Sequence, residues 1–280
     1  MRQSILPRFE WRIGMYKQTY LCEIVEKKQL APEIIDMTIK SKELAADALP
    51  GQFLNIRCGD GCSTILRRPI SICDVNPAAD TVRFIFQVKG SGTQFLEAKQ
   101  CGDTLDIMGP LGSPFHLLEK VDGDIILLGG GIGVFPLFLL AKSICEKGVK
   151  PTAYLGFRSA DLVVMEAEFK QYAKDVKVST DDGSYGMHGY ATAYLVEHIK
   201  NKKVGLVYAC GPEPMLRQVQ SICRENKVPC QLSLEQRMGC GIGACLVCAC
   251  KIKQKDGFSY QHVCKDGPVF WSEDVVFGGG

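Results

Sequence analysis

The hydrophobic pattern of the chain changes near residue 120, and this change constrains the fold more than any other feature. Before it, apolar residues alternate with polar ones in short stretches. In "VRFIFQV", residues 82–88, one face of the segment is apolar throughout, which is the period of a half-buried strand. Turn-forming segments such as "LPGQ" and "GPLGSP" separate these stretches. Short strands at this spacing predict a small antiparallel β-barrel over residues 15–118.

After residue 120 the pattern is that of buried strands alternating with helices. The run "IILL" at residues 125–128 is continuously apolar, the glycine loop "GGGIG" follows it, and "FPLFLLAKSICEKG" repeats with the period of a helix. Further strand-like and helix-like segments alternate as far as residue 226. Apolar strands separated by helices predict a parallel α/β domain over residues 119–226.

The last segment, residues 227–280, contains one strand-like run, a cysteine-rich loop and a predicted hairpin, "ACKIKQKDGFSYQHVC". It carries too little apolar sequence for an independent core of ordinary size. We therefore expect a bound metal to supply part of the folding free energy of this small C-terminal module. At the other end of the chain, residues 1–14 show no clear period, and we expect them to form a poorly ordered extension.

The composition argues against several classes of function. The 280-residue chain has a formal net charge of +2 and no strongly basic or acidic block, so neither nucleic acid nor a membrane is expected as a partner. No apolar run is long enough for a membrane span and the N-terminus lacks the apolar core of a secretory signal, which predicts a cytoplasmic protein. In that reducing compartment most of the fourteen cysteines would remain thiols, so a regular cysteine cluster indicates a metal site.

Four cysteines near the C-terminus have the spacing of metal ligands. Cys240, Cys245, Cys248 and Cys264 follow C-x4-C-x2-C-x15-C, which matches the plant-type [2Fe-2S] pattern. Four thiolates also suit tetrahedral zinc, but zinc ribbons usually place their ligands in two similar C-x2-C knuckles. A Rieske cluster would need two histidine ligands in place of two of the cysteines. The spacing therefore favours an iron-sulfur cluster, and the neighbouring Cys250 is expected to be a buried core residue.

Two further regions contain groups suited to phosphates. In the barrel, Arg68 and Ser71 of "RRPISI" offer a guanidinium and a hydroxyl, and "KGSGT" at residues 89–93 is a glycine loop before a predicted helix. In the α/β domain, the glycine run at residues 129–133 lies between a buried strand and a helix, where free amide groups can hold a pyrophosphate. That run lacks the full G-x-G-x-x-G fingerprint, so the residues alone only suggest a nucleotide site.

The order of these motifs resembles that of a known family. "PGQF", "RRPISI", "GSGT", "GGGIGVFPL", "CGPEPM" and the cysteine loop occur in the order seen in ferredoxin-NADP-reductase-like proteins, and the composite resembles the electron-transfer subunits of class 1B dihydroorotate dehydrogenases. The resemblance implies FAD in the barrel, NAD at the glycine run and a [2Fe-2S] cluster on the four cysteines. The FAD contacts that it implies are Arg68, Pro69, Ile70, Ser71, Ile85, Phe86, Gln87, Gly92 and Thr93, and the NAD contacts are Gly130, Gly131, Ile132 and Gly133. It also places Cys210 beside the nicotinamide ring, as a positioning group without an acid-base role.

The function implied by the resemblance is electron transfer within a larger enzyme. Electrons would run from an FMN-containing catalytic subunit, which oxidises dihydroorotate, through the cluster and FAD to NAD+, in a heterotetramer with two copies of each subunit. FAD fits between the other two carriers because a flavin exchanges electrons singly or in pairs, whereas a cluster exchanges one and a nicotinamide two. The chain carries no substrate-oxidising group of residues that we can recognise beyond these cofactor sites.

The sequence leaves two alternatives open. The small subunit of a sulfide dehydrogenase or of an NADH-ferredoxin:NADP oxidoreductase shares the flavin and nucleotide domains, although an aspartate can replace one cluster cysteine in those relatives. A binding protein stabilised by zinc, without enzymatic activity, belongs to a different class and would contain neither iron nor flavin. The choice between NAD and NADP also stays open.

Overall fold

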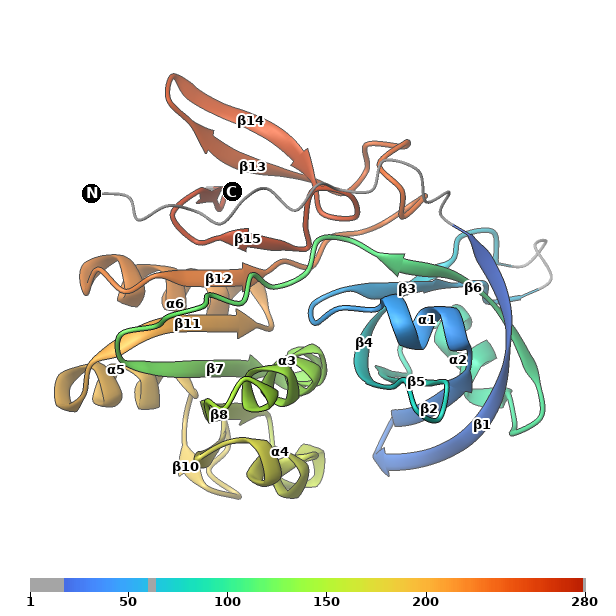
Figure 1. Ribbon diagram of the computed structural model, residues 1–280, viewed down its shortest axis with the longest axis horizontal. Coiled ribbons are helices and arrows are strands. Elements are labelled where there is room, and N and C mark those ends of the chain that lie inside the picture. The colour runs from blue at the N-terminus through green and yellow to red at the C-terminus, as the bar shows by residue number, and fades with distance from the viewer. Residues whose placement is uncertain (1–17, 60–63, 279–280) are drawn as a thin grey trace.

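The first domain is a closed antiparallel barrel (Figure 1). The computed structural model describes residues 18–59 and 64–278, so the extension predicted over residues 1–14 lies outside the described residues. Six strands close the barrel in the order β1-β2-β5-β4-β3-β6. They are β1 (Thr19–Ala31), β2 (Ile34–Lys40), β3 (Phe53–Ile56), β4 (Arg68–Asn76), β5 (Thr81–Gln87) and β6 (Thr104–Leu111), with the short helices α1 (Lys42–Asp47) and α2 (Ser91–Ala98) between them. The predicted barrel is confirmed, and alternate residues of β5, such as Val82 and Phe84, fill its core.

The second domain is a seven-stranded sheet with helices on both faces (Figure 1). The order is β10-β9-β8-β7-β11-β12-β15, and β15 alone among the described strands of this sheet is antiparallel to its neighbour. The strands are β7 (Asp124–Gly130), β8 (Thr152–Phe157), β9 (Asp175–Thr180), β10 (Met187–His188), β11 (Val204–Cys210), β12 (Cys230–Ser233) and β15 (Val269–Trp271). The helices are α3 (Phe135–Glu146), α4 (Glu166–Tyr172), α5 (Thr192–Asn201) and α6 (Glu213–Glu225), with 3-10 turns at Gly131–Val134 and Ala160–Leu162. The predicted parallel α/β domain is confirmed.

Residues 125–128 of β7 are all apolar because both faces of the strand are covered. Leu127 lies in a core with residues of α3 and α4, whereas Ile126 and Leu128 lie in a second core with residues of α5 and α6. The carboxyl ends of β7 and β11 point towards the barrel in Figure 1. Ligands of open α/β sheets bind at this edge, so the fold places the glycine run and Cys210 at the junction between the two domains.

The C-terminal segment is not an independent unit. After β12 joins the sheet of the second domain, the chain forms a second, small sheet from β13 (Ala249–Gln254), β14 (Gly257–His262) and β16 (Val275–Val276), and it returns to the first sheet in β15. Cys250 is buried as expected, and it shares one apolar core with Leu216 of α6 and Phe53 of the barrel. The expectation that a metal must compensate for a missing core therefore needs correction, because the module borrows the core of its neighbours. The boundary drawn at residue 226 precedes a strand that belongs to the sheet of the second domain.

The barrel and the α/β domain are joined by apolar contacts and by partly buried ion pairs. Ile85 of the barrel lies in the same apolar core as α3. Arg83 of β5 pairs with Asp36 of β2 at 2.8 Å and with Glu168 of α4 at 2.5 Å, and Asp36 is only 3% exposed. These two carboxylates outweigh the effect of burial and raise the pKa of Arg83, so the guanidinium stays charged. Such contacts fix the orientation of the two domains. Within the parts of the chain that the structure describes, no helix is long and apolar enough to span a membrane.

Candidate functional site

The cysteine loop is shaped by backbone hydrogen bonds to sulfur. Cys240, Cys245 and Cys248 lie on the segment between β12 and β13, and Cys264 follows β14. Each of the four sulfur atoms accepts a backbone N–H: Cys240 Sγ from Ala244 at 3.2 Å, Cys245 Sγ from Cys240 at 3.3 Å, Cys248 Sγ from Cys264 at 3.4 Å and Cys264 Sγ from Gly243 at 3.1 Å. The bond from Gly243 joins the loop to the end of the hairpin. The structure thus brings the four predicted ligands together.

The four thiols lie in two pairs. Cys240 and Cys245 form one pair within the loop, and Cys248 and Cys264 form the other. Tetrahedral zinc needs four donors around one centre, whereas a [2Fe-2S] cluster needs two donors at each of two irons. The paired arrangement fits the two-iron cluster.

The two pairs differ in charge and in exposure. Burial would raise the pKa of the Cys240 thiol, but the amides of Ile242, Cys245 and Ala244 outweigh it and lower the pKa to about 6. Burial and the adjacent Cys248 raise the pKa of Cys264 to about 12. A cationic metal centre would favour ionisation of this second pair, because a coordinating thiol loses its proton. Cys245 is exposed while Cys248 and Cys264 are buried, so one side of the donor set faces the surface.

The two predicted phosphate-binding elements of the barrel lie against each other. Arg68 begins β4, and its guanidinium lies so close to Gly92 of α2 that a β-carbon at Gly92 would stand 2.5 Å from Arg68 Nε. The guanidinium donates to the carbonyl of Leu66 at 2.7 Å. Thr93 Oγ1 accepts the amides of Lys89 at 2.8 Å and of Gly90 at 3.1 Å, which closes the glycine loop. A positive group beside an exposed helix start suits a diphosphate.

The side chains of the other predicted FAD contacts do not all point to the same side of the barrel wall. Pro69, Ile70 and Ser71 follow Arg68 along β4 and are half-buried. Phe86 points into the barrel core, so only its backbone faces a ring bound outside the barrel. Ile85 points the other way, into the core shared with α3. Gln87, at the end of β5, is half-buried, and its amide lies 3.5 Å from Glu33 Oε2.

The glycine run is packed tightly against β11 and α6. A β-carbon at Gly133 would stand 2.3 Å from the carbonyl oxygen of Cys210, and one at Gly130 would stand 2.7 Å from Met215 Sδ. Gly131 has a φ of +55°, a conformation that favours glycine, and a β-carbon there would meet no atom within 4 Å. Ile132 is exposed. Close packing thus accounts for Gly130 and Gly133, while Gly131 leaves open space beside the start of the helix.

Cys210 lies at the carboxyl end of β11, between Gly129 of β7 and Ser233 of β12. Burial raises the pKa of its thiol to about 12, and the nearby Glu235 adds to this effect while Ser233 opposes it. The thiol is therefore neutral at any physiological pH. The positioning role of Cys210 beside a nicotinamide ring stays a prediction.

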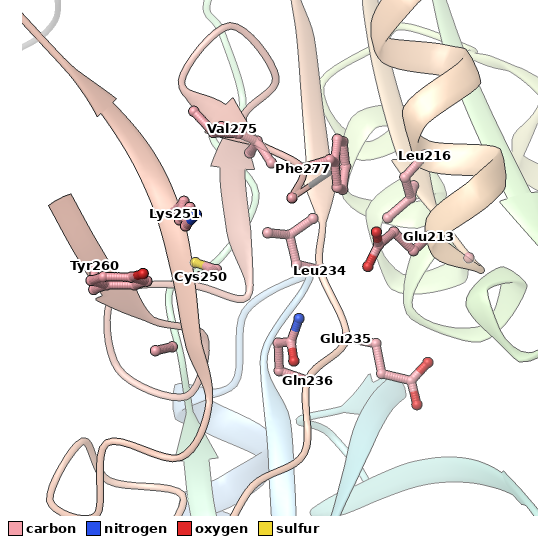
Figure 2. A pocket seen from close by; sticks show the side chains of 14 residues that line it. Glu213, Leu216, Leu234, Glu235, Gln236, Cys250, Lys251, Tyr260, Val275 and Phe277 are labelled. Carbon is pink, nitrogen blue, oxygen red and sulfur yellow. The ribbon is translucent and has the colours of Figure 1, made fainter. Parts of the chain in front are cut away.

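A small pocket lies between the second domain and the C-terminal module. It has a volume of about 210 Å³ and is lined by residues of α6, of the chain after β12 and of the hairpin, among them Leu216, Leu234 and Cys250. Figure 2 shows Phe277 of the C-terminal tail next to Leu216, which narrows this space. Ligand pockets usually enclose about 300–1,000 Å³, so this pocket alone is too small for a dinucleotide.

Comparison with known proteins identifies the family. A model of the family described as "Iron-sulfur cluster binding domain of dihydroorotate dehydrogenase B" matches residues 235–276, and one described as "Oxidoreductase NAD-binding domain" matches residues 127–221. The "Dihydroorotate dehydrogenase B (NAD(+)), electron transfer subunit" of Fusobacterium nucleatum subsp. nucleatum is 41% identical over 257 residues, which cover 91% of this chain and 97% of the relative. The protein of the same name from Shouchella clausii is 37% identical over 263 residues, which cover 94% and 100%.

The chain belongs to the family of dihydroorotate dehydrogenase B electron transfer subunits. A solved structure reported as "Insights into flavin-based electron bifurcation via the NADH-dependent reduced ferredoxin-NADP oxidoreductase structure" is 33% identical, with a TM-score of 0.81 over 93% of this chain and 91% of that chain. The predicted family, the oxidoreductase class and the cofactor set of FAD, a [2Fe-2S] cluster and NAD are confirmed. An electron transfer subunit of dihydroorotate dehydrogenase B also implies a catalytic partner subunit.

One residue at the contact between the barrel and the cysteine loop was not predicted from the sequence. Asn55 of β3 is 1% exposed, and its side-chain amide donates to the carbonyl of Cys240 at 3.2 Å. A signal was present, because asparagine is depleted in strands and here interrupts the apolar run "FLNI". Only the structure shows that the cysteine loop covers this strand.

Proposed function

We propose that the chain takes up single electrons at its cysteine loop and delivers them in pairs, through FAD, to NAD+. The proposal rests on one observation: the predicted nucleotide and cluster sites lie next to each other beside β12, and the cysteine loop also contacts the barrel. Ser233, the last residue of β12, pairs with Cys210, and Cys240, the first cysteine of the loop, follows seven residues later. The same loop contacts β3 of the barrel, beside the strand that carries Arg68 and Ser71.

The residues of the chain would divide the work as follows. Cys240, Cys245, Cys248 and Cys264 hold the cluster, with the exposed Cys245 nearest to the surface. Bound FAD supplies the exchange between single electrons and a hydride. The strand from Arg68 to Ser71 and the start of α2 orient the flavin, while the glycine run holds the nucleotide and Cys210 keeps its ring in place without exchanging a proton.

The proposed partner is an FMN-containing catalytic subunit that oxidises dihydroorotate, in a complex with two copies of each subunit. The names of the relatives support a catalytic partner, and the exposed side of the cysteine loop offers a route for incoming electrons. We also propose that the protein works in the cytoplasm, a reducing compartment in which a regular cysteine cluster serves as a metal site.

Two assays test this function. The purified chain should reduce an artificial dye with NADH and should show no turnover of dihydroorotate. Copurification from the native host should then yield a complex that oxidises dihydroorotate with NAD+. Dihydroorotate oxidation by the isolated chain would contradict the assignment, and so would a copurifying partner that lacks FMN.

The 33% identity to a chain of the bifurcating NADH-dependent reduced ferredoxin-NADP oxidoreductase favours one second candidate, a subunit of such a complex. The four cysteines argue for the first candidate, since an aspartate can replace one of them in that second group. Activity of the native complex with reduced ferredoxin and NADP+, but not with dihydroorotate, would select the second candidate.

A further inference from the structure

Asn55 is a buried polar residue at the contact between the barrel and the cysteine loop. Its neighbours on β3, Leu54 and Ile56, lie in the barrel core, so the side chain of Asn55 points out of the barrel. It is nevertheless only 1% exposed, because the cysteine loop covers it. The amide Nδ2 donates to the carbonyl oxygen of Cys240 at 3.2 Å, across a separation of 185 residues.

The loop is built to approach Asn55 closely. Gly241, the residue after Cys240, has a φ of +74°. A β-carbon at Gly241 would stand 2.3 Å from Asn55 Nδ2 and 3.1 Å from Asn55 Cγ. No larger residue fits at position 241 while Asn55 keeps its place, so the glycine and the asparagine together set the distance between the strand and the loop.

Asn55 is equally fixed on the side of the flavin. In the pairing of β3 with β4 it lies opposite Pro69, one of the predicted FAD contacts. Its carbonyl accepts a hydrogen bond from Arg67 Nη1 at 3.3 Å, and Asp106 holds the same guanidinium through both carboxylate oxygens, at 2.9 and 3.0 Å. The backbone of Asn55 therefore moves with the strand that carries Pro69.

The asparagine is costly as a packing residue. Its Oδ1 is buried and has no hydrogen-bond partner among the described residues. A buried acceptor without a partner loses its hydration without compensation, and a leucine of similar size would avoid that loss. The single bond from Nδ2 to Cys240 is thus the specific interaction that the side chain makes.

We propose that Asn55 is a positioning residue for electron transfer, which holds the Cys240 segment of the cluster loop at a fixed distance from the flavin strand. This inference rests on the proposed function, because it assumes FAD on β4 and the cluster on Cys240. In the direction that is easiest to measure, NADH would supply a hydride, two electrons and one proton, to FAD held by the strand from Arg68 to Ser71, and one of these electrons would go on to an oxidised cluster held by the four cysteines while the other stays on FAD. Asn55 should affect only the transfer from the flavin to the cluster.

The test uses the full chain with both cofactors, mixed rapidly with NADH in the absence of a partner subunit. Asn55→Ala removes the donor and the contact, and Asn55→Asp keeps the shape but replaces the donor by an acceptor. In both variants the rate of flavin bleaching should match the wild type. The rate of cluster reduction should fall by at least about tenfold, within the loss of up to about a hundredfold that a misplacement of about 1 Å can cause. The midpoint potential and the EPR spectrum of the reduced cluster should shift as well.

Gly241→Ala attacks the same contact from the other side and completes a double-mutant cycle. In the wild-type background the new methyl group meets Asn55 Nδ2, so the cluster reduction rate should fall. In the Asn55→Ala background the nearest remaining Asn55 atom is the β-carbon at 3.6 Å, so only the backbone strain of alanine at a φ of +74° remains, and the second change should lower the rate less than it does in the wild-type background. Asn201→Ala is the control: this side-chain amide in the last turn of α5 donates to the carbonyl of Glu197 at 2.9 Å and lies outside the proposed cofactor sites, so its loss should leave the cluster reduction rate unchanged.

Wild-type rates and potentials in both Asn55 variants would overturn the proposal. So would loss of the cluster from both variants with FAD retained, since Asn55 would then be needed for cluster binding itself. A wild-type chain whose flavin is not reduced by NADH would contradict the proposed function. That result differs from one in which only the rate of cluster reduction is unchanged in the Asn55 variants.

Discussion

Replacing Gly133 with alanine places a methyl group where the glycine run meets β11. The new carbon would stand 2.3 Å from the carbonyl oxygen of Cys210 and 2.6 Å from the Cα of Gly211. Both are backbone atoms, so neither can turn aside as a flexible side chain would. Restoring an ordinary contact of about 3.4 Å requires the run and β11 to separate by roughly 1 Å, a shift comparable with the tolerance of a catalytic constellation.

This displacement opens the site between the proposed nucleotide loop and Cys210. We expect the rate of flavin reduction by NADH to fall about a hundredfold, the loss typical of a misplacement of about 1 Å between reacting groups. Overpacking should also lower the free energy of unfolding by about 1–3 kcal/mol. The FAD and iron content should not change, because neither Arg68 nor the cysteine loop lies against Gly133.

The assay is rapid mixing of the purified variant with NADH while flavin absorbance is followed, with urea unfolding as the measure of stability. Gly278→Ala serves as the control, because a β-carbon there would meet no atom within 4 Å. Flavin reduction at the wild-type rate in a Gly133→Ala chain that carries stoichiometric FAD would refute the assignment of this run to the nucleotide site.

Three further changes test other parts of the structure. Arg83→Met leaves Asp36 buried without its main partner and should lower the free energy of unfolding by about 3–5 kcal/mol in urea titrations. The control is Lys203→Met, which breaks an exposed pair with Asp122 and should change the free energy of unfolding by less than about 0.5 kcal/mol. Cys245→Ser should lose iron and labile sulfide but keep FAD and the flavin reduction by NADH; a full iron content would contradict its role as a ligand. Cys210→Ala should slow flavin reduction without altering the shape of its pH profile, because a thiol whose pKa is raised to about 12 stays protonated across the assay range; the disappearance of an ionisation from the profile would show that Cys210 exchanges a proton after all.

The sequence predicted the two large domains because their hydrophobic periods differ and each extends over many residues. Every second residue of "VRFIFQV" enters the barrel core, and Ile126 to Leu128 are apolar because helices cover both faces of β7. Local spacing also selected the four thiols that the fold brings together. In each of these cases the information lies within a short segment of the chain.

Contacts between distant segments were beyond the reach of such reasoning. The run "CQLSLEQ" looked like part of an isolated module, but its strand β12 pairs with β11, and β15 returns from residue 269 to pair with β12. The carboxylate partners of Arg83 come from residues 36 and 168, and neither position carries a local signal of the pairing. Asn55 lies 185 residues from Cys240. Apolar patterning shows that a face is buried but does not show which segment covers it.

The shared core of the C-terminal module changes what cluster removal should do. A module held together by metal alone would unfold when the cluster is lost. Here Val263 and Phe270 lie in one apolar core with Leu216 and Leu232, and β15 is hydrogen-bonded to β12 along residues 269–271. These contacts do not depend on iron, so they should survive in the cluster-free chain. Disorder should then be confined to the segment between β12 and β13, and the proposed flavin and nucleotide sites, whose residues lie on other segments of the chain, should continue to exchange hydride.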